Sequence, residues 1–364
     1  MSAPAPRRGL VLGAGGVLGF SWAVGALAAL QESEGFDVRD AEVIVGTSAG
    51  SVTAALLGCG VPVDVLLRHQ QGIPAPGDPV IDYDDEADGA GPLPPRPGLG
   101  IGSTELLRHS ALHPRTVTPL AALSSMLPVG RATLAPVRGV VEAVHAAAGG
   151  GDWAPHPATW IVAMDYDTGK RVPFGTPGAP PATLPDAVGA SCAIPGWFAP
   201  VEIGDRRYVD GGTCSTTSLD LLAGLGLDEV YVIAPMVSFA YDEATGVARL
   251  ERRLRRAVTR RLMREAEKVR ASGTHVTMLG PGPEDLAAIG ANMMDPTRRQ
   301  TVLETSLRTS ADALRRGEDP YVLDESLAHV HDDTLEDDLD GALGAFAEDD
   351  GHGGTTTRSS GRAS

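Results

Sequence analysis

The chain has few cysteines and no arrangement of histidines that would hold a metal ion. Its 364 residues include only three cysteines, Cys59, Cys192 and Cys214. Because the number is odd and the spacing wide, a disulfide framework is excluded and a reducing compartment is favoured. The nine histidines form no HxxxH or HExxH pair, so we expect no metal and no other cofactor.

Basic residues are outnumbered by acidic ones, and the net charge is −17. The excess of acid lies in two segments. Residues 72–100, which are rich in proline and glycine, contain six acidic residues, and residues 332–364 contain nine against two arginines. We predict a mobile insertion over 72–100 and a disordered, low-complexity tail over 331–364. The remaining chain is nearly neutral. The acidic overall charge argues against nucleic acid as a partner.

No long hydrophobic run is free of glycine. Residues 9–30 are 22 uncharged residues after Arg7 and Arg8, but six of them are glycines. A signal peptide or membrane span would not use glycine in this way, whereas a strand, a tight loop and a helix would. We therefore expect a strand over 9–12, a helix over 20–30 and a cytoplasmic protein.

Strand-like and helix-like segments alternate along the chain. Apolar runs at 10–12, 43–45, 159–164, 229–234 and 275–279 predict strands, and residues 165–174 are typical of a hairpin turn with its return strand. This alternation predicts an α/β fold with a mainly parallel central sheet covered on both faces. We expect an N-terminal tail over 1–7 and one domain over 8–330, with a helical cap over 103–149.

Ser48 lies in the sequence Gly46-Thr47-Ser48-Ala49-Gly50, directly after the apolar run Val43–Val45. This GxSxG pattern is typical of a nucleophile elbow, a sharp turn from strand to helix that exposes a serine hydroxyl. Glycine is needed on both sides because neighbouring backbone comes close to the turn. Only two strand-like runs precede Ser48, which is too few for the usual α/β-hydrolase order.

Two further glycine-rich motifs flank the elbow in the sequence. The first, Gly13-Ala14-Gly15-Gly16-Val17-Leu18-Gly19, joins the first strand to a helix and offers backbone N–H groups to a phosphate or an oxyanion. The second, Tyr208-Val209-Asp210-Gly211-Gly212, ends a strand with a carboxylate in a glycine turn. The order of the three motifs resembles that of the patatin-like phospholipase family, and the segment Ala190–Gly196 before Asp210 is similar as well. The resemblance extends over roughly residues 8–300.

This resemblance implies a three-layer α/β/α sandwich and a lipid acyl hydrolase that works with a Ser-Asp dyad. Ser48 is the implied nucleophile, Asp210 the general base, and the amides of Gly15 and Gly16 the oxyanion hole. The cap over 103–149 is then where acyl-chain specificity lies. Two positions depart from the family pattern, since Ala14 replaces a glycine and Leu18 an arginine or lysine. The residues that support the three motifs are Gly13, Gly19, Gly46, Gly50, Gly211 and Gly212.

Two other functions fit parts of the sequence. A dinucleotide-binding protein would use residues 13–19 as its phosphate loop, but Leu18 stands where the third glycine of GxGxxG belongs. The second strand ends at Gly46 rather than at the acidic residue that would bind a ribose. A patatin-like scaffold without activity, which binds lipid or a protein, is the other alternative.

Residues 249–270 contain ten basic residues against three glutamates. Leu250, Leu254, Val258 and Leu262 recur every four residues, which predicts a helix that packs on the body through this stripe. The arginines either form a solvated surface or draw the protein to an anionic membrane. The segment has no aromatic residue that could stack on a base, so it does not indicate nucleic-acid binding.

Overall fold

A computed structural model describes residues 5–81, 96, 98, 100–113, 116–239 and 247–317. The described residues belong to one compact unit, residues 1–320. The predicted disordered tail and most of the predicted mobile insertion lie outside the described residues. Asp78, at the start of that insertion, forms an ion pair of 2.7 Å with Arg68.

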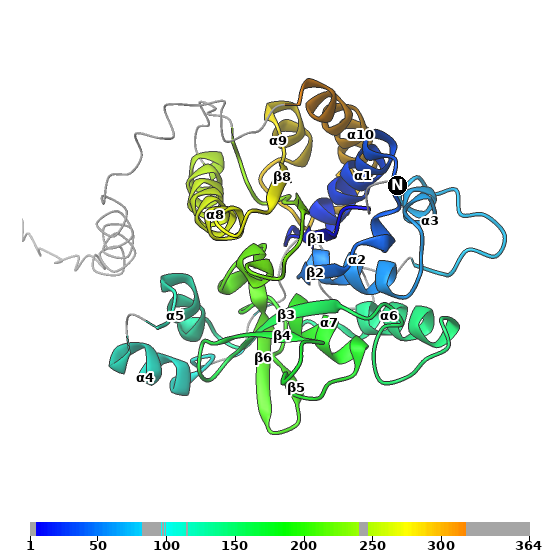
Figure 1. Ribbon diagram of the computed structural model, residues 1–364. Coiled ribbons are helices and arrows are strands. Elements are labelled where there is room, and N and C mark those ends of the chain that lie inside the picture. Colours follow the sequence, from blue (N-terminus) through cyan, green and yellow to red (C-terminus); the bar gives the residue numbers. More distant parts are fainter. Residues whose placement is uncertain are drawn as a thin grey trace, which may run out of the picture. The chain divides into compact units, whose positions relative to one another are not determined.

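The centre of the fold is an eight-stranded sheet with the order β5-β6-β3-β2-β1-β7-β8, in which β4 pairs with β3 (Figure 1). The pairs that join β3, β2, β1, β7 and β8 are parallel, whereas β4, β5 and β6 run antiparallel to their neighbours. The strands are β1 (Arg8–Leu12), β2 (Val43–Thr47), β3 (Thr159–Asp165), β4 (Arg171–Phe174), β5 (Val201–Ile203), β6 (Arg206–Asp210), β7 (Glu229–Ile233) and β8 (His275–Leu279). All five predicted strands and the predicted hairpin are confirmed.

Helices cover both faces of this sheet, because successive side chains of a strand point to opposite sides. Leu10 and Leu12 of β1 pack with α1, α2 and α7, whereas Val11 packs with α8. The helices are α1 (Gly16–Glu34), α2 (Ala49–Gly58), α3 (Val63–Gln70), α4 (Thr104–Leu112), α5 (Pro119–Met126), α6 (Ala135–Ala147), α7 (Leu184–Cys192), α8 (Val247–Arg270), α9 (Pro283–Ile289) and α10 (Arg299–Arg316). The predicted three-layer α/β/α sandwich is confirmed.

The segment predicted as a helical cap contains α4, α5 and α6. Helix α4 begins where the sequence indicates, because the Ser103 hydroxyl accepts a hydrogen bond of 3.1 Å from the N–H of Leu106 and caps the helix. Leu106, Val117 and Ala121 pack on Met164 of β3. Helices α4 and α5 therefore lie against the end of the sheet at which β3 meets β6.

Helix α8 forms as predicted, but its buried face differs from the predicted stripe. Leu262 is buried, whereas 44% of Leu254 is exposed. A strict four-residue repeat drifts around a helix of 3.6 residues per turn. The buried face instead follows alternating steps of three and four, through Arg255, Thr259, Leu262, Ala266 and Val269.

The run of uncharged residues near the N-terminus forms β1, a loop and the first part of α1, as predicted. Within the part of the chain that the structure describes, no helix combines the length and the apolarity of a membrane span.

Candidate active site

Ser48 occupies a strained turn between β2 and α2. Its φ of 55° and ψ of −124° lie outside the regions that a side chain with a β-carbon normally adopts, and only one other non-glycine residue in the described chain has positive φ. Strain of this kind costs on the order of 1–3 kcal/mol and persists where the surroundings enforce it, often at functional sites. The structure therefore contains the sharp turn from strand to helix that the sequence predicted at Ser48, and this turn is called the elbow below.

The two glycines of the GxSxG motif are required by close packing around the turn. A β-carbon on Gly46 would lie 2.6 Å from the β-carbon of Ala54, and one on Gly50 would lie 2.7 Å from the carbonyl oxygen of Gly13. Both distances are shorter than van der Waals contact. Gly50 thus lets the start of α2 touch the loop that follows β1, and the elbow and the glycine loop become neighbours.

Asp210, the last residue of β6, lies near the end of β2, and its strand runs in the opposite direction to β2. Strands β2 and β6 share one edge of β3, with Thr47 opposite Val162 and Asp210 opposite Ala163. Because β2 is parallel to β3 and β6 antiparallel, their carboxyl ends converge along that edge. Residues 48 and 210 are brought together in this way although 162 positions separate them in the sequence.

A short 3₁₀ helix, η2 (Gly211–Thr213), starts directly after Asp210. The carboxylate accepts a hydrogen bond of 2.7 Å from the N–H of Gly212. A β-carbon on Gly211 would lie 2.9 Å from the carbonyl carbon of Val162, and one on Gly212 would lie 3.5 Å from the β-carbon of Ala14. Gly211 therefore allows close approach to β3, and Gly212 lies within ordinary contact distance of the glycine loop.

Burial dominates the electrostatics of Asp210. Only 6% of the residue is exposed, and desolvation raises the pKa of its carboxyl to about 6, while hydrogen bonds with the Ser48 side chain and the Gly212 amide act to lower it. Ser48 itself is 5% exposed. The site thus combines a buried hydroxyl with a carboxylate whose affinity for a proton is raised.

The glycine loop presents two unpaired amides. The N–H of Gly13 donates to the carbonyl of Ile233 and that of Ala14 to the carbonyl of Thr216, both at 2.8 Å. Among the described residues, the N–H groups of Gly15 and Gly16 have no partner. They lie at the N-terminus of α1, where the helix dipole also favours negative charge. The predicted oxyanion amides are thus available to a ligand.

Gly19 and Leu18, at the end of the glycine loop, have structural roles. A β-carbon on Gly19 would lie 3.1 Å from that of Pro235. Leu18 is fully buried in the core, and its N–H donates to the carbonyl of Met293 at 2.9 Å. Its side chain therefore packs inside the protein, and position 18 does not present a group to an anionic ligand.

The sequence did not single out Ser191, which holds the elbow in place. The Ser191 hydroxyl accepts a hydrogen bond of 2.9 Å from the N–H of Ser48 and donates one of 2.6 Å to the carbonyl of Val162. It therefore ties the turn to β3. Ser191 does lie in the segment Ala190–Gly196 that resembles the family. Its role could not be predicted from that segment, because it depends on a contact with Ser48, 143 positions away.

The N–H of Ala49, at the first residue of α2, was also missed. It has no partner among the described residues, and the residue after a nucleophile commonly contributes to an oxyanion hole. Three or more side chains suited to bind a metal ion do not gather anywhere in the described part of the chain.

A family model of patatin-like phospholipases matches residues 10–73 and 131–223. The two matched segments contain the glycine loop, the elbow and the Asp-Gly-Gly turn. The resemblance to the patatin-like phospholipase family that the motifs predicted is therefore confirmed over these two segments.

Several solved structures are similar to this chain, two of which are VipD and ExoU, and no curated protein matches it. The crystal structure of VipD from Legionella pneumophila aligns with a TM-score of 0.41 and 15% identity, over 86% of this chain and 68% of VipD. The type III effector protein ExoU aligns with a TM-score of 0.35 and 18% identity, over 96% of this chain and 63% of ExoU.

Proposed function

We propose that the protein is a serine acyl hydrolase that cleaves carboxylic esters of lipids. The observation that carries this proposal is the strained Ser48, next to the buried carboxylate of Asp210 and the unpaired amides of Gly15 and Gly16. The patatin-like match covers all three motifs. It favours an oxyanion rather than the phosphate of a dinucleotide as the ligand of the glycine loop.

The chemistry needs only these groups. Asp210 takes the proton of the Ser48 hydroxyl while the serine oxygen attacks the ester carbonyl, and the loop amides bind the resulting oxyanion. The carbon–oxygen bond to the alcohol breaks, and the alcohol leaves with the proton from Asp210. Asp210 then takes a proton from water, whose oxygen attacks the acyl-serine. The fatty acid leaves, and Ser48 regains its proton.

The surface beside the site supports a lipid as the substrate. Among the described residues, most of the large apolar side chains that are exposed lie between residues 101 and 129, mainly on α4 and α5. The Thr118 hydroxyl at the start of α5 donates to the carbonyl of Thr213 at 3.0 Å, three residues after Asp210. The exposed apolar side chains of this segment are Ile101, Leu107, Leu112, Leu120, Leu123, Met126, Leu127 and Val129.

Hydrolysis of a soluble p-nitrophenyl ester and of phospholipid and triglyceride vesicles, together with labelling by a fluorophosphonate, tests the proposed function. We expect release of p-nitrophenol, release of fatty acid from at least one lipid, and covalent labelling at Ser48. A folded protein that gives none of these results is a patatin-like scaffold without activity, which is the alternative function. Release of p-nitrophenol without fatty acid would leave an esterase for small acyl esters.

The activity is expected to depend on pH through Asp210. The carboxylate must be ionised to accept the serine proton, and its pKa is raised to about 6 because it is buried. We therefore expect kcat/KM for a soluble ester to rise about tenfold per pH unit below pH 6 and to level off above it. A profile that stays flat between pH 4.5 and 8, with the protein folded throughout, would contradict this assignment of the base.

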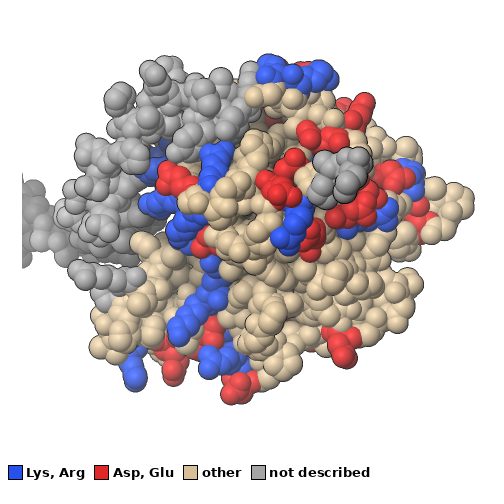
Figure 2. Space-filling view, in the orientation of Figure 1, with Lys and Arg blue, Asp and Glu red and all other residues tan. Residues whose placement is uncertain are grey.

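We also propose that α8 contacts anionic membranes, through those of its arginines whose side chains reach the surface. Arg252 and Arg255 are buried, whereas Arg253 and Arg264 are exposed. The pKa of Arg260 is lowered by burial and by the neighbouring cations Arg264 and Arg256, so like charges gather on this helix. Figure 2 shows Lys and Arg side chains over this part of the molecule, with acidic side chains among them.

Replacing Arg253, Arg260 and Arg264 with glutamine is expected to weaken binding to anionic vesicles severalfold, and binding by the wild type should fall steeply with salt. Vesicle sedimentation measures both effects. The matched control replaces Arg308, Arg315 and Arg316, which are also exposed and lie on α10. Equal loss in the two triple variants would indicate nonspecific charge attraction, and no loss in either would exclude α8 as the contact.

A further inference from the structure

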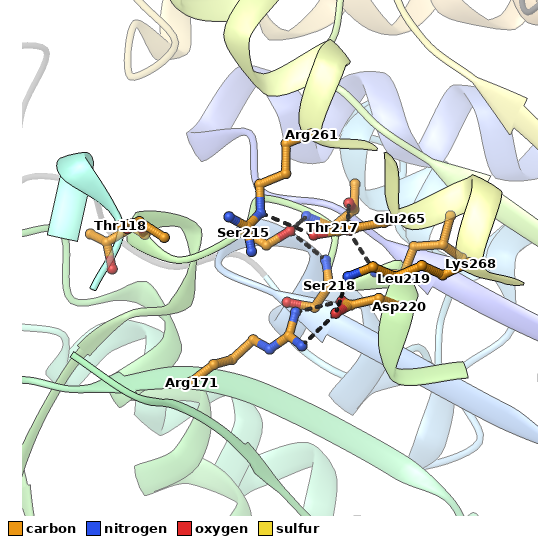
Figure 3. Close-up of polar contacts among 11 residues, drawn as sticks. Thr118, Arg171, Ser215, Thr217, Ser218, Leu219, Asp220, Arg261, Glu265 and Lys268 are labelled. Atoms are coloured by element: carbon orange, nitrogen blue, oxygen red, sulfur yellow. Dashed lines mark hydrogen bonds and ion pairs between the residues drawn. The ribbon is translucent and has the colours of Figure 1, made fainter. Parts of the chain in front are cut away.

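Glu265 of α8 is a buried carboxylate that the proposed chemistry does not use. It is 3% exposed. Its Oε2 atom accepts hydrogen bonds of 3.0 Å from the Thr217 hydroxyl and from the N–H of Leu219, and Oε1 accepts one of 3.0 Å from Arg261 (Figure 3). A buried carboxylate that binds a loop in this way holds the backbone of the loop in place.

The loop that Glu265 holds, residues 215–219, is strained. Ser218 has a φ of 57° and a ψ of 30°, the left-handed conformation that is unfavourable for a residue other than glycine. The Ser215 hydroxyl accepts a hydrogen bond of 2.9 Å from the N–H of Ser218. Together with the bonds to Glu265, this contact keeps Ser218 in a conformation that it would otherwise leave.

Residues 215–219 form hydrogen bonds both with the glycine loop and with the turn that follows Asp210. The carbonyl of Thr216 accepts the hydrogen bond from the N–H of Ala14, at 2.8 Å, and so orients the peptide that precedes Gly15 and Gly16. The N–H of Ser215 donates to the carbonyl of Gly211 at 3.0 Å, directly after Asp210. A shift of Thr216 therefore changes the direction of the unpaired loop amides.

A second anchor lies at the far end of the turn, in the 3₁₀ helix η3 (Leu219–Leu222). Arg171 of β4 donates two hydrogen bonds to Asp220, of 2.6 and 3.0 Å, and Lys268 lies 4.0 Å from the same carboxylate (Figure 3). Because no hydrogen bond of this anchor involves Glu265, loss of the Glu265 side chain is expected to displace residues 215–218 and leave Asp220 attached to β4.

We propose that Glu265 is a positioning residue for the oxyanion loop. It holds Thr217 and Leu219, which fixes the Thr216 carbonyl, and this carbonyl aligns the glycine loop through Ala14. The inference rests on the proposed function, since it concerns the alignment of the amides that bind the oxyanion. Glu265 acts through other residues and touches neither the substrate nor Ser48.

Glu265→Ala is expected to lower kcat for a soluble ester about 10- to 100-fold, with KM changed less than about threefold, because the oxyanion amides act mainly in the transition state. Glu265→Gln should recover most of the loss, since its amide oxygen still accepts hydrogen bonds. The apparent pKa of the pH profile should stay near that of the wild type, because the pKa of Asp210 is set by its burial and by hydrogen bonds with Ser48 and Gly212, not by Glu265. Arg261, whose side chain is 36% exposed, can turn to solvent in both variants.

Asp285 provides the matched control. It is 1% exposed and, like Glu265, accepts one backbone amide and one threonine hydroxyl, from Gly282 and Thr309. Asp285→Ala should lower the melting temperature as Glu265→Ala does but leave kcat within about twofold of the wild type. Ser218→Gly added to Glu265→Ala should recover part of kcat, because glycine adopts the left-handed conformation without strain.

If Glu265→Ala does not fold, Thr217→Val takes its place. This substitution removes the hydrogen bond from the Thr217 hydroxyl to Glu265 without changing the shape of the side chain. We expect it to lower kcat several-fold. Folded Glu265 or Thr217 variants with the kcat of the wild type would overturn the inference and leave the proposed function intact. So would a loss of kcat in Asp285→Ala that equals the loss in Glu265→Ala. A wild-type protein without esterase activity would reject the proposed function itself.

Discussion

Replacing Ser48 with alanine is expected to abolish fluorophosphonate labelling and to lower kcat/KM for esters by at least about 10⁴-fold, because alanine lacks the oxygen that forms the acyl intermediate. Ser48 lies at the only elbow of this kind that the described residues contain, between a strand end and a helix N-terminus. Mass spectrometry of the labelled protein and initial rates with a p-nitrophenyl ester measure the two effects. Ser310→Ala is the control, since Ser310 is also buried but its hydroxyl has no partner in the described structure.

Ser48→Gly separates the loss of chemistry from loss of the fold. Glycine adopts a φ of 55° and a ψ of −124° without the strain that serine carries there. We expect this variant to be inactive and to melt at or above the temperature of the wild type. Labelling that persists in Ser48→Ala would place the nucleophile elsewhere and reject the elbow as the site.

Asp210→Asn is expected to lower kcat/KM by about 10³–10⁴-fold and to slow fluorophosphonate labelling in parallel. Asparagine can still accept the hydrogen bond from Gly212, but it cannot take the proton of Ser48. Losses of this size follow when one member of a nucleophile–base unit is removed. Activity within tenfold of the wild type would show that another group is the base.

The same substitution is expected to stabilise the protein at neutral pH. The folded carboxyl has a pKa of about 6, whereas an unfolded aspartate has a pKa of about 3.9. The folded state therefore binds the proton more tightly, and its stability falls as the pH rises from about 4 to 6 and stays low above that. Asparagine avoids this cost, which is on the order of 3 kcal/mol for about two pKa units. The melting temperature of Asp210→Asn should exceed that of the wild type at pH 8 and match it near pH 4.

Asp285→Asn is the control for the expected gain in stability. Burial also raises the pKa of Asp285, against the hydrogen bonds that it accepts, so its substitution should change stability in the same direction. Asp285 lies in the first turn of α9 and bonds to Thr309 of α10. Its variant should keep the activity of the wild type, whereas Asp210→Asn should gain stability and lose activity together.

Much of the local structure could be predicted because its signals lie within a few residues. The apolar run Val43–Val45 followed by Gly-x-Ser-x-Gly predicts a strand, a sharp turn and a helix, since these residue types favour such a turn through their local backbone preferences. Ser103 marks the start of α4 in the same way. The alternation of strand-like and helix-like segments was likewise enough to predict a mainly parallel sheet with helices on both faces.

The buried face of α8 shows where this kind of prediction fails. Leucines repeated every four residues suggested a stripe, but the face that packs on the sheet includes Arg255, which donates a hydrogen bond of 2.7 Å to the carbonyl of Pro235. Arginine is a poor candidate for a core position in any sequence pattern. Its burial depends on carbonyl oxygens contributed by a distant loop.

The sequence alone determined the secondary structure, the three motifs and the residue types available for catalysis, because these depend on local backbone preferences and on the alternation of apolar residues. Only the tertiary structure decided that β2 and β6 end beside each other on β3, that Ser191 ties the elbow to this strand, and that Glu265 holds the turn beside the glycine loop. Burial of Asp210 was decided there too, and with it the raised pKa. The hydrogen bonds that tie Ser191 to the elbow and Glu265 to the turn join residues 46 to 143 positions apart. Their energies depend on close packing and desolvation, which no local pattern encodes.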